Sequence, residues 1–149
     1  MIRLAEVALT EVQMPLKEPF RISSGVQTVR RILLVRVRDH DGAEGWGECA
    51  AGELPNYGPE TIDTAWAAIG AWVAPRLFGR GFAHPREIFP VLEENFRGHR
   101  MAKGAVEMAC WDLAARRADE PLARFLGGTR EGLREVIDVG ISLGIQESP

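Results

Sequence analysis

Lysine, histidine and acidic side chains are the residues of this sequence that could move protons or bind a metal. Lys17 and Lys103 are its lysines. A lysine serves as a general acid or base when its surroundings shift its pKa toward neutrality. The two stand far apart in the sequence, and an isolated lysine is normally solvated at the surface. We therefore expect Lys17 and Lys103 to be surface groups without a catalytic role.

The acidic residues that could be mistaken for metal ligands are Glu44, Glu48, Glu53, Glu60, Glu107 and Asp112. Glu107 and Asp112 lie five positions apart on a predicted helix, whereas side chains three or four positions apart share a helix face. We expect these two to have structural partners, such as an arginine or a backbone N–H group. His40, His84 and His99 show no ligand-like spacing. The sequence thus predicts no catalytic histidine and no metal site in this chain.

The first half of the chain has the pattern of three antiparallel strands, which we place at residues 2–14, 28–39 and 43–49. Asp41-Gly42 is a strong hairpin-turn signal, and the prolines of residues 14–27 predict a loop. Gly45-Trp46-Gly47 resembles a phosphate-binding loop but lacks the lysine and the following helix, so we interpret it as part of the hairpin. The middle strand is apolar on both faces, which predicts a sheet covered on both sides.

Helical periodicity replaces the strand pattern in the second half, and it predicts helices at residues 59–73, 84–96 and 100–118 and a last helical turn in 121–128. Pro59 suits the first position of its helix. Apolar residues extend almost around the helix at 100–118, which predicts deep burial, with Trp111 buried. Residues 135–145 are mostly apolar and alternating, which predicts a buried strand. This order of elements indicates an α+β domain followed by a short tail.

Composition and charge exclude several classes of protein. The 149 residues are 46% apolar and 26% charged, with a net charge of −3, as in an ordinary globular domain. Basic residues are scattered among acidic ones, so neither nucleic acid nor an anionic membrane is an expected partner. The N-terminus lacks a signal-peptide core, and Cys49 and Cys110 are isolated. We expect a cytoplasmic protein with reduced thiols.

Five segments carry a resemblance to a known family: "VQMPLKEPFR" (12–21), "GWGEC" (45–49), "GHRMAKGAVEMACWDL" (98–113), "PLARFLGG" (121–128) and "GISLGI" (140–145). In this order they resemble the N-terminal capping domain of the enolase superfamily, in the muconate-lactonizing branch with o-succinylbenzoate synthases and N-acylamino acid racemases. The resemblance implies a cap over residues 1–129, in which a three-stranded antiparallel meander precedes a helical layer. Residues 130–149 then resemble the start of the C-terminal (β/α)7β barrel, with only its first strand present.

The resemblance also implies a chemistry, which is proton abstraction next to a carboxylate. In the family, lysines on barrel strands act as acid and base, and a divalent metal, usually Mg²⁺, is held by three barrel carboxylates. These positions would all lie beyond residue 149. We therefore expect the isolated chain to be inactive and to hold no metal, although the complete enzyme would need one.

The residues that would face a small-molecule carboxylate substrate lie on two loops of the cap, residues 19–27 and 50–58, and on the first barrel strand. By the family's motifs they are Phe20, Ser24, Gly52, Tyr57 and Ser142. Relatives often carry a bulky apolar group where Ser24 and Gly52 stand, which implies a roomier or more polar pocket. Without the resemblance, Phe20 and Tyr57 would be interpreted as ordinary loop-to-core packing.

Two alternatives remain open at this point. The full-length enzyme could instead be a muconate cycloisomerase or a dipeptide epimerase, because these types differ mainly in barrel residues. The chain could also be a stand-alone, non-enzymatic α+β protein, or a remnant, stabilised by self-association. Residues 134–149 would then either be disordered or pair with the same segment of another copy or with the edge of the sheet, and we expect a homo-oligomer.

Overall fold

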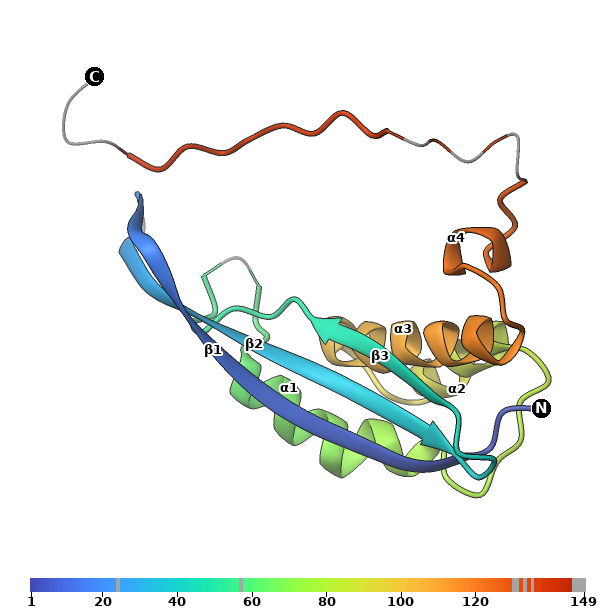
Figure 1. Ribbon diagram of the computed structural model, residues 1–149. Helices are drawn as coiled ribbons and strands as arrows, with labels where there is room; N and C mark the ends of the chain where they lie inside the picture. Colours follow the sequence, from blue (N-terminus) through green and yellow to red (C-terminus); the bar gives the residue numbers. More distant parts are fainter. Residues whose placement is uncertain (24, 57, 130–131, 133, 135, 146–149) are drawn as a thin grey trace.

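The computed structural model describes residues 1–23, 25–56, 58–129, 132, 134 and 136–145. Three strands, β1 (Leu4–Ile22), β2 (Gly25–Asp39) and β3 (Glu44–Cys49), form an antiparallel sheet in the order β1-β2-β3 (Figure 1). Asp41 and Gly42 lie in the turn between β2 and β3. The predicted α+β fold, with a three-stranded meander followed by helices, is confirmed.

The loop predicted at residues 14–27 is wrong, because β1 continues to Ile22 and β2 begins at Gly25. These residues form a long hairpin instead. Pro15 and Pro19 are tolerated because β1 is an edge strand, whose outward side needs no donor for a neighbouring strand. The pairing of β1 with β2 is irregular between Pro15 and Phe20. Residues between these two positions therefore lie outside the regular hydrogen-bond ladder.

One face of the sheet carries the core. Leu33, Val35 and Val37 are fully buried on it, and the helices lie on this side of the sheet (Figure 1). On the opposite face Leu34 is half-buried, and Trp46 is 44% exposed. Charged residues, including the ion pairs of Arg36 with Glu6 and Glu44, stand on this face. The expectation of a sheet covered on both sides is therefore wrong for the described residues.

The first helical region consists of α1 (Ile62–Ala68), η1 (Ile69–Val73) and η2 (Ala74–Arg76). It begins later than predicted, because Thr61 is the N-cap. The Thr61 hydroxyl accepts from the Thr64 N–H group, and the Thr64 hydroxyl accepts from the Thr61 N–H group. This reciprocal pair satisfies two donors that a helix leaves free at its start. Pro59 consequently lies outside the helix.

The second helical region also differs from its prediction. A 3₁₀ turn, η3 (Pro85–Glu87), precedes α2 (Ile88–Glu93), which ends three residues before the predicted end at residue 96. Glu94 is extended and Asn95 has a φ of 51°, a left-handed conformation that ends a helix. Pro90 lies in the first turn of α2, where a missing N–H group costs little.

The longest helix is α3 (Arg100–Arg117), as the apolar periodicity predicts, and α4 (Leu122–Phe125) follows it. The burial of α3 is less complete than predicted, because Met101 is 37% and Met108 46% exposed. Trp111 is half-buried rather than buried, and its ring packs against His84 and Phe125. Among the described residues, no helix combines the length and the apolar character needed to cross a membrane.

Residues 136–145 run apart from the helices toward the tip of the β1–β2 hairpin (Figure 1). They form no strand within the part of the chain that the structure describes, and the Ile145 N–H group donates to the Arg21 carbonyl at 2.8 Å. Their large apolar side chains are exposed: Val136, Ile137, Val139, Ile141, Leu143 and Ile145. The interpretation of this segment as a first barrel strand stays a prediction.

An ion-pair cluster joins the sheet to α1, and it predicts that the domain loses stability in acid. Arg31 donates to both carboxylate oxygens of Glu11 at 2.8 Å and to Asp63 at 2.8 Å. Hydrogen bonding from Arg31, with a further contribution from Gln13, lowers the pKa of Glu11 to about 2. Since this pKa lies below that of the unfolded chain, the stabilisation is present above about pH 4.5 and is lost as the pH falls toward 2.

Glu11→Gln is accordingly expected to lower the free energy of unfolding at pH 7 and to have a smaller effect at pH 3. Urea unfolding followed by circular dichroism at both pH values measures the difference from wild type. Glu48→Gln is the matched control, because Glu48 is exposed and has no ion pair among the described residues. An effect of Glu11→Gln that is equal at the two pH values would contradict the assignment.

Candidate functional site

The hairpin tip (residues 19–27) holds the first predicted contact residue. Phe20 is half-buried at the end of β1 and pairs with Gln27 of β2. The end of the described chain approaches it closely. A β-carbon placed on Gly144 would lie 3.1 Å from the Arg21 carbonyl oxygen and 3.2 Å from Phe20 Cδ2. Ser24, the second predicted residue of this tip, lies outside the described residues.

Ser142 lies two positions before Gly144 and is exposed. The contact of Gly144 and Ile145 with the hairpin tip therefore brings the segment of Ser142 to the neighbourhood of Phe20. These two residues come from opposite ends of the chain. A role of either residue in substrate binding stays a prediction.

The loop at 50–58 is closed at its base. The Gly52 carbonyl accepts from the Ile62 N–H group at 2.9 Å, and Gly52 forms a parallel bridge with Thr61. Gly52 itself is exposed. A β-carbon placed on Gly52 would lie 3.5 Å from the Leu54 carbonyl oxygen, the nearest atom. Among the described residues, no atom of the hairpin tip or of Ser142 lies within 4 Å of that β-carbon position. Tyr57 lies outside the described residues.

The two lysines differ from each other. Lys17 is exposed, as expected. Lys103 is fully buried, so the prediction of a solvated surface group is wrong. Its Nζ atom lies 2.6 Å from Glu93 Oε1 and 4.3 Å from the centre of the Phe96 ring, and it also donates to the Phe96 carbonyl. The sequence does hold a signal for this burial. The neighbouring Ala102, Ala105 and Val106 are small or apolar, and they place Lys103 on a buried stretch of helix.

The acids on α3 have structural partners, as expected. Glu107 accepts from the Trp111 indole N–H group at 2.6 Å. Asp112 accepts from the Trp46 backbone N–H group at 2.9 Å and from Arg116 at 2.8 Å. The described residues contain no group of three His, Cys, Asp or Glu side chains that could hold a metal ion. Asp112 thus joins α3 to the edge strand β3, whereas the bond of Glu107 lies within α3.

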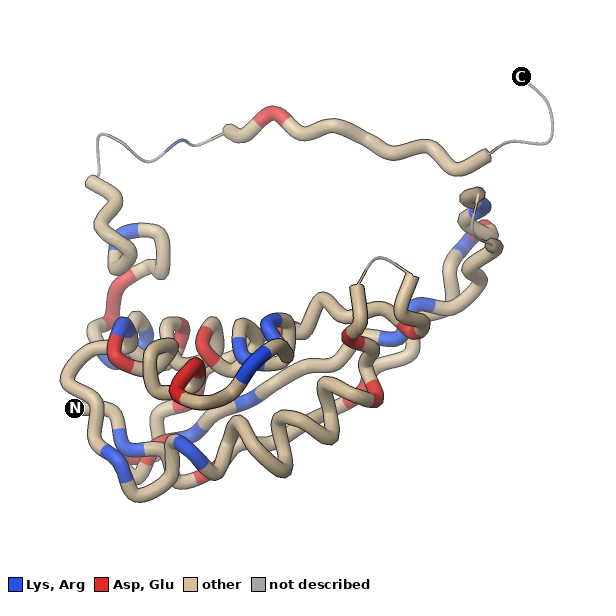
Figure 2. The backbone as a smooth tube through the Cα atoms, turned by 180° about the vertical axis from the view of Figure 1, so that it is seen from behind, with Lys and Arg blue, Asp and Glu red and all other residues tan. Residues whose placement is uncertain are grey.

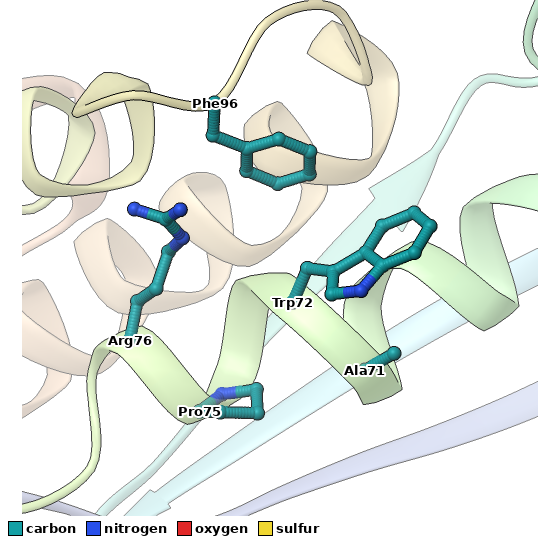
Figure 3. A pocket seen from close by; sticks show the side chains of 5 residues that line it. All are labelled: Ala71, Trp72, Pro75, Arg76 and Phe96. Atoms are coloured by element: carbon teal, nitrogen blue, oxygen red, sulfur yellow. The ribbon is translucent and has the colours of Figure 1, made fainter.

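A hollow of about 560 Å³ opens on the helical side of the domain and is lined by Ala71, Trp72, Pro75, Arg76 and Phe96 (Figure 3). The Arg76 guanidinium lies 5.1 Å from the centre of the Phe96 ring and donates to the Glu94 carbonyl at 2.7 Å. Trp72 packs edge-on against the same ring. Phe20, Gly52 and Ser142, the predicted contact residues that the structure describes, do not line this hollow.

Acidic and basic residues are interspersed over the described part of the domain (Figure 2). Three arginines of β2 are paired with acids: Arg31 with Glu11, Arg36 with Glu6 and Glu44, and Arg38 with Glu6. A surface that binds nucleic acid would present unpaired positive charge along one face. These three arginines therefore give no support to a nucleic-acid interface, because their charge is already paired.

The fold and its motifs define a class of protein. The family described as "Mandelate racemase / muconate lactonizing enzyme, N-terminal domain" matches residues 4–127. The chain therefore belongs to this family, within the enolase superfamily. It is 41% identical over 145 residues to an o-succinylbenzoate synthase of Geobacillus kaustophilus, and this match covers 97% of the chain and 37% of the relative. It is 39% identical to an N-succinylamino acid racemase of Amycolatopsis sp, with 99% and 38% covered.

Solved structures agree with these relatives. A protein of Enterococcus faecalis described as an unknown member of the enolase superfamily superposes with a TM-score of 0.84 at 37% identity, covering 99% of this chain and 38% of that one. A dipeptide epimerase of Cytophaga hutchinsonii, in complex with Mg and the dipeptide D-Ala-L-Val, has a TM-score of 0.76 at 33% identity, with 88% and 34% covered. The chain thus has the fold of this family's N-terminal domain, and it spans less than two fifths of the length of these relatives.

Proposed function

We propose that this chain is the capping domain of a divalent-metal-dependent enzyme that removes a proton next to a carboxylate group. Within that class, the o-succinylbenzoate synthase and N-acylamino acid racemase type is supported best. The observation that carries the proposal is the similarity, over almost the whole chain, to an o-succinylbenzoate synthase and to an N-succinylamino acid racemase. The muconate cycloisomerase of Rhodococcus opacus is less similar, at 32% identity.

The cap's role in this proposal is to contact the substrate's side chain. Phe20 and Ser142 are supported by the approach of the terminal segment to the hairpin tip. Gly52 is supported by its place in a loop whose base is fixed to the start of α1. Ser24 and Tyr57 belong to the proposal through the family's motifs alone. A loop that covers a bound substrate also excludes water from it.

The metal and the proton-transferring lysines are proposed to come from the barrel. Mg²⁺ would stabilise the charge that develops on the substrate carboxylate. Lys103 is not available for proton transfer, because its Nζ atom is held by Glu93 and the Phe96 carbonyl in the interior. Lys17 is exposed on β1, at one end of the proposed cap. We therefore expect the isolated chain to be inactive.

A fusion enzyme tests the proposal. Residues 1–145 replace the corresponding N-terminal part of the Geobacillus kaustophilus relative, and the fusion is assayed with Mg²⁺ for formation of o-succinylbenzoate and for racemisation of an N-succinylamino acid. We expect activity in the fusion and none above a metal-free blank in the 149-residue chain alone. A change in the ratio of the two activities, relative to the intact relative, is expected if the cap sets specificity.

The intact relative and its barrel without a cap are the controls. A fusion that is folded by circular dichroism but inactive in both assays would contradict the proposed function. Turnover by the isolated chain would contradict its expected inactivity. Light scattering on the 149-residue chain and on a version ending at Thr129 tests the proposed homo-oligomer, since the exposed apolar side chains of residues 136–145 favour packing against further protein.

A further inference from the structure

The N-terminus of α3 lacks a cap of its own. His99 occupies the N-cap position with a left-handed φ of 51°, and its side chain makes no capping hydrogen bond. The first N–H groups of an α-helix have no partner within the helix, and they normally bond to a Ser, Thr, Asp or Asn side chain at the N-cap. The start of this long helix must therefore be satisfied from elsewhere.

Glu60 supplies the missing acceptors from 41 positions earlier in the chain. Its Oε1 atom accepts from the Met101 N–H group at 2.9 Å, and its Oε2 atom accepts from the Ala102 N–H group at 3.1 Å. A carboxylate at this end of a helix is also favoured by the helix dipole, and hydrogen bonds to a charged acceptor are stronger than neutral ones. Both oxygens are used, so the geometry fixes the carboxylate against α3.

Glu60 also belongs to the closed base of the loop at 50–58. Immediately after it, Thr61 bridges to Gly52 and caps α1, and the Ile62 N–H group donates to the Gly52 carbonyl. Ile62 is 1% exposed, and Ala51, on the other arm of the loop, is 6% exposed. The two arms are thus joined to each other and, through Glu60, to the start of α3.

We infer that Glu60 is a positioning residue, whose carboxylate fixes the base of the 50–58 loop on α3 and so determines where Gly52 is presented. This inference rests on the proposed function for its enzymatic consequence, but its structural part does not. Glu60 touches no substrate in this account. It acts through the hydrogen bonds between the loop and the two helices.

Hydrogen exchange on the 149-residue chain tests the structural part. Glu60→Gln keeps the size of the side chain and one oxygen acceptor, whereas Glu60→Ala removes both acceptors. We expect exchange at Met101 and Ala102 to become about tenfold faster in Glu60→Ala, since charge-assisted capping bonds are lost. The Ile62 amide, which reports the loop base, is expected to exchange faster with them. Glu60→Gln should give a smaller increase at the same amides.

Glu48→Gln is the matched control, because it removes the same charge from an exposed position on β3. It should leave the three amides unchanged. Faster exchange at Met101 and Ala102 with no change at Ile62 would overturn the inference, because Glu60 would then be a helix cap without influence on the loop. If Glu60→Ala does not fold, the same comparison is made with Glu60→Gln.

The enzymatic part uses the fusion enzyme described above. We expect Glu60→Gln to raise KM about fivefold while kcat changes less than twofold, which is the signature of a lost binding contact. An unchanged KM beside faster Ile62 exchange would overturn the positioning role. An inactive wild-type fusion would instead refute the proposed function, and the exchange result would still decide whether Glu60 fixes the loop.

Discussion

Replacing Gly47 by alanine is expected to destabilise the domain by about 3 kcal/mol or more, because β3 and α3 touch backbone to backbone at this point. A β-carbon on Gly47 would lie 2.1 Å from the Ala105 carbonyl oxygen, and one on Gly45 would lie 2.2 Å from that of Ala109. Neither acceptor can rotate away, since both belong to the backbone of a helix. A methyl group therefore fits only if the sheet and the helix separate.

Urea unfolding of Gly47→Ala, followed by circular dichroism, measures this cost. Gly104→Ala is the matched control, because Gly104 lies within α3 with no atom within 4 Å of an added β-carbon. That substitution is expected to stabilise the domain by about 0.5–1 kcal/mol through helix propensity. A cost below about 1 kcal/mol for Gly47→Ala would show that the close approach is not rigid.

Local patterns predict the elements whose signals are local. The turn at Asp41-Gly42 gives the hairpin of β2 and β3, and apolar periodicity gives α3 almost to the residue. The prolines of β1 were misleading, because their effect depends on whether a strand lies at the edge of the sheet. The start of α1 was misplaced for a related reason, since Pro59 and Thr61 are both good start signals and only the capping bonds select Thr61.

Features that join distant parts of the chain were not predictable from local patterns. Gly45 and Gly47 are glycines because a helix about 60 positions later packs on them. Glu60 is one of many acids until the start of α3 is seen to lack a cap. The candidate contact residues came from the resemblance to a family, and neither spacing nor periodicity singles out Phe20 or Ser142. Residues whose role depends on tertiary contacts can therefore be identified only from the structure or from relatives.

Lys103 is a buried charge that could stabilise the fold in two ways, through its ion pair with Glu93 or through the Phe96 ring and carbonyl. Its removal is expected to separate the two. It is fully buried on α3, and its partner Glu93 keeps a 35% exposed side chain. Hydrogen bonding from Lys103 holds the pKa of Glu93 below its ordinary value. Burying a charge is costly, so a pair of this kind stabilises little relative to a neutral replacement, whereas loss of one partner leaves the other uncompensated.

Lys103→Met is therefore expected to cost about 1–2 kcal/mol, because the Phe96 carbonyl loses its donor while Glu93 can be hydrated. Lys103→Ala should cost about 3 kcal/mol through the cavity it leaves. Glu93→Gln should be more damaging than Lys103→Met, because the ammonium group remains buried without its counter-charge. Urea unfolding at pH 7 ranks the three variants, and Lys17→Met, the same change at an exposed lysine, should be neutral within about 0.5 kcal/mol. If Lys103→Met proves worse than Glu93→Gln, the charge of Lys103 itself stabilises the fold, through the Phe96 ring and carbonyl rather than through Glu93.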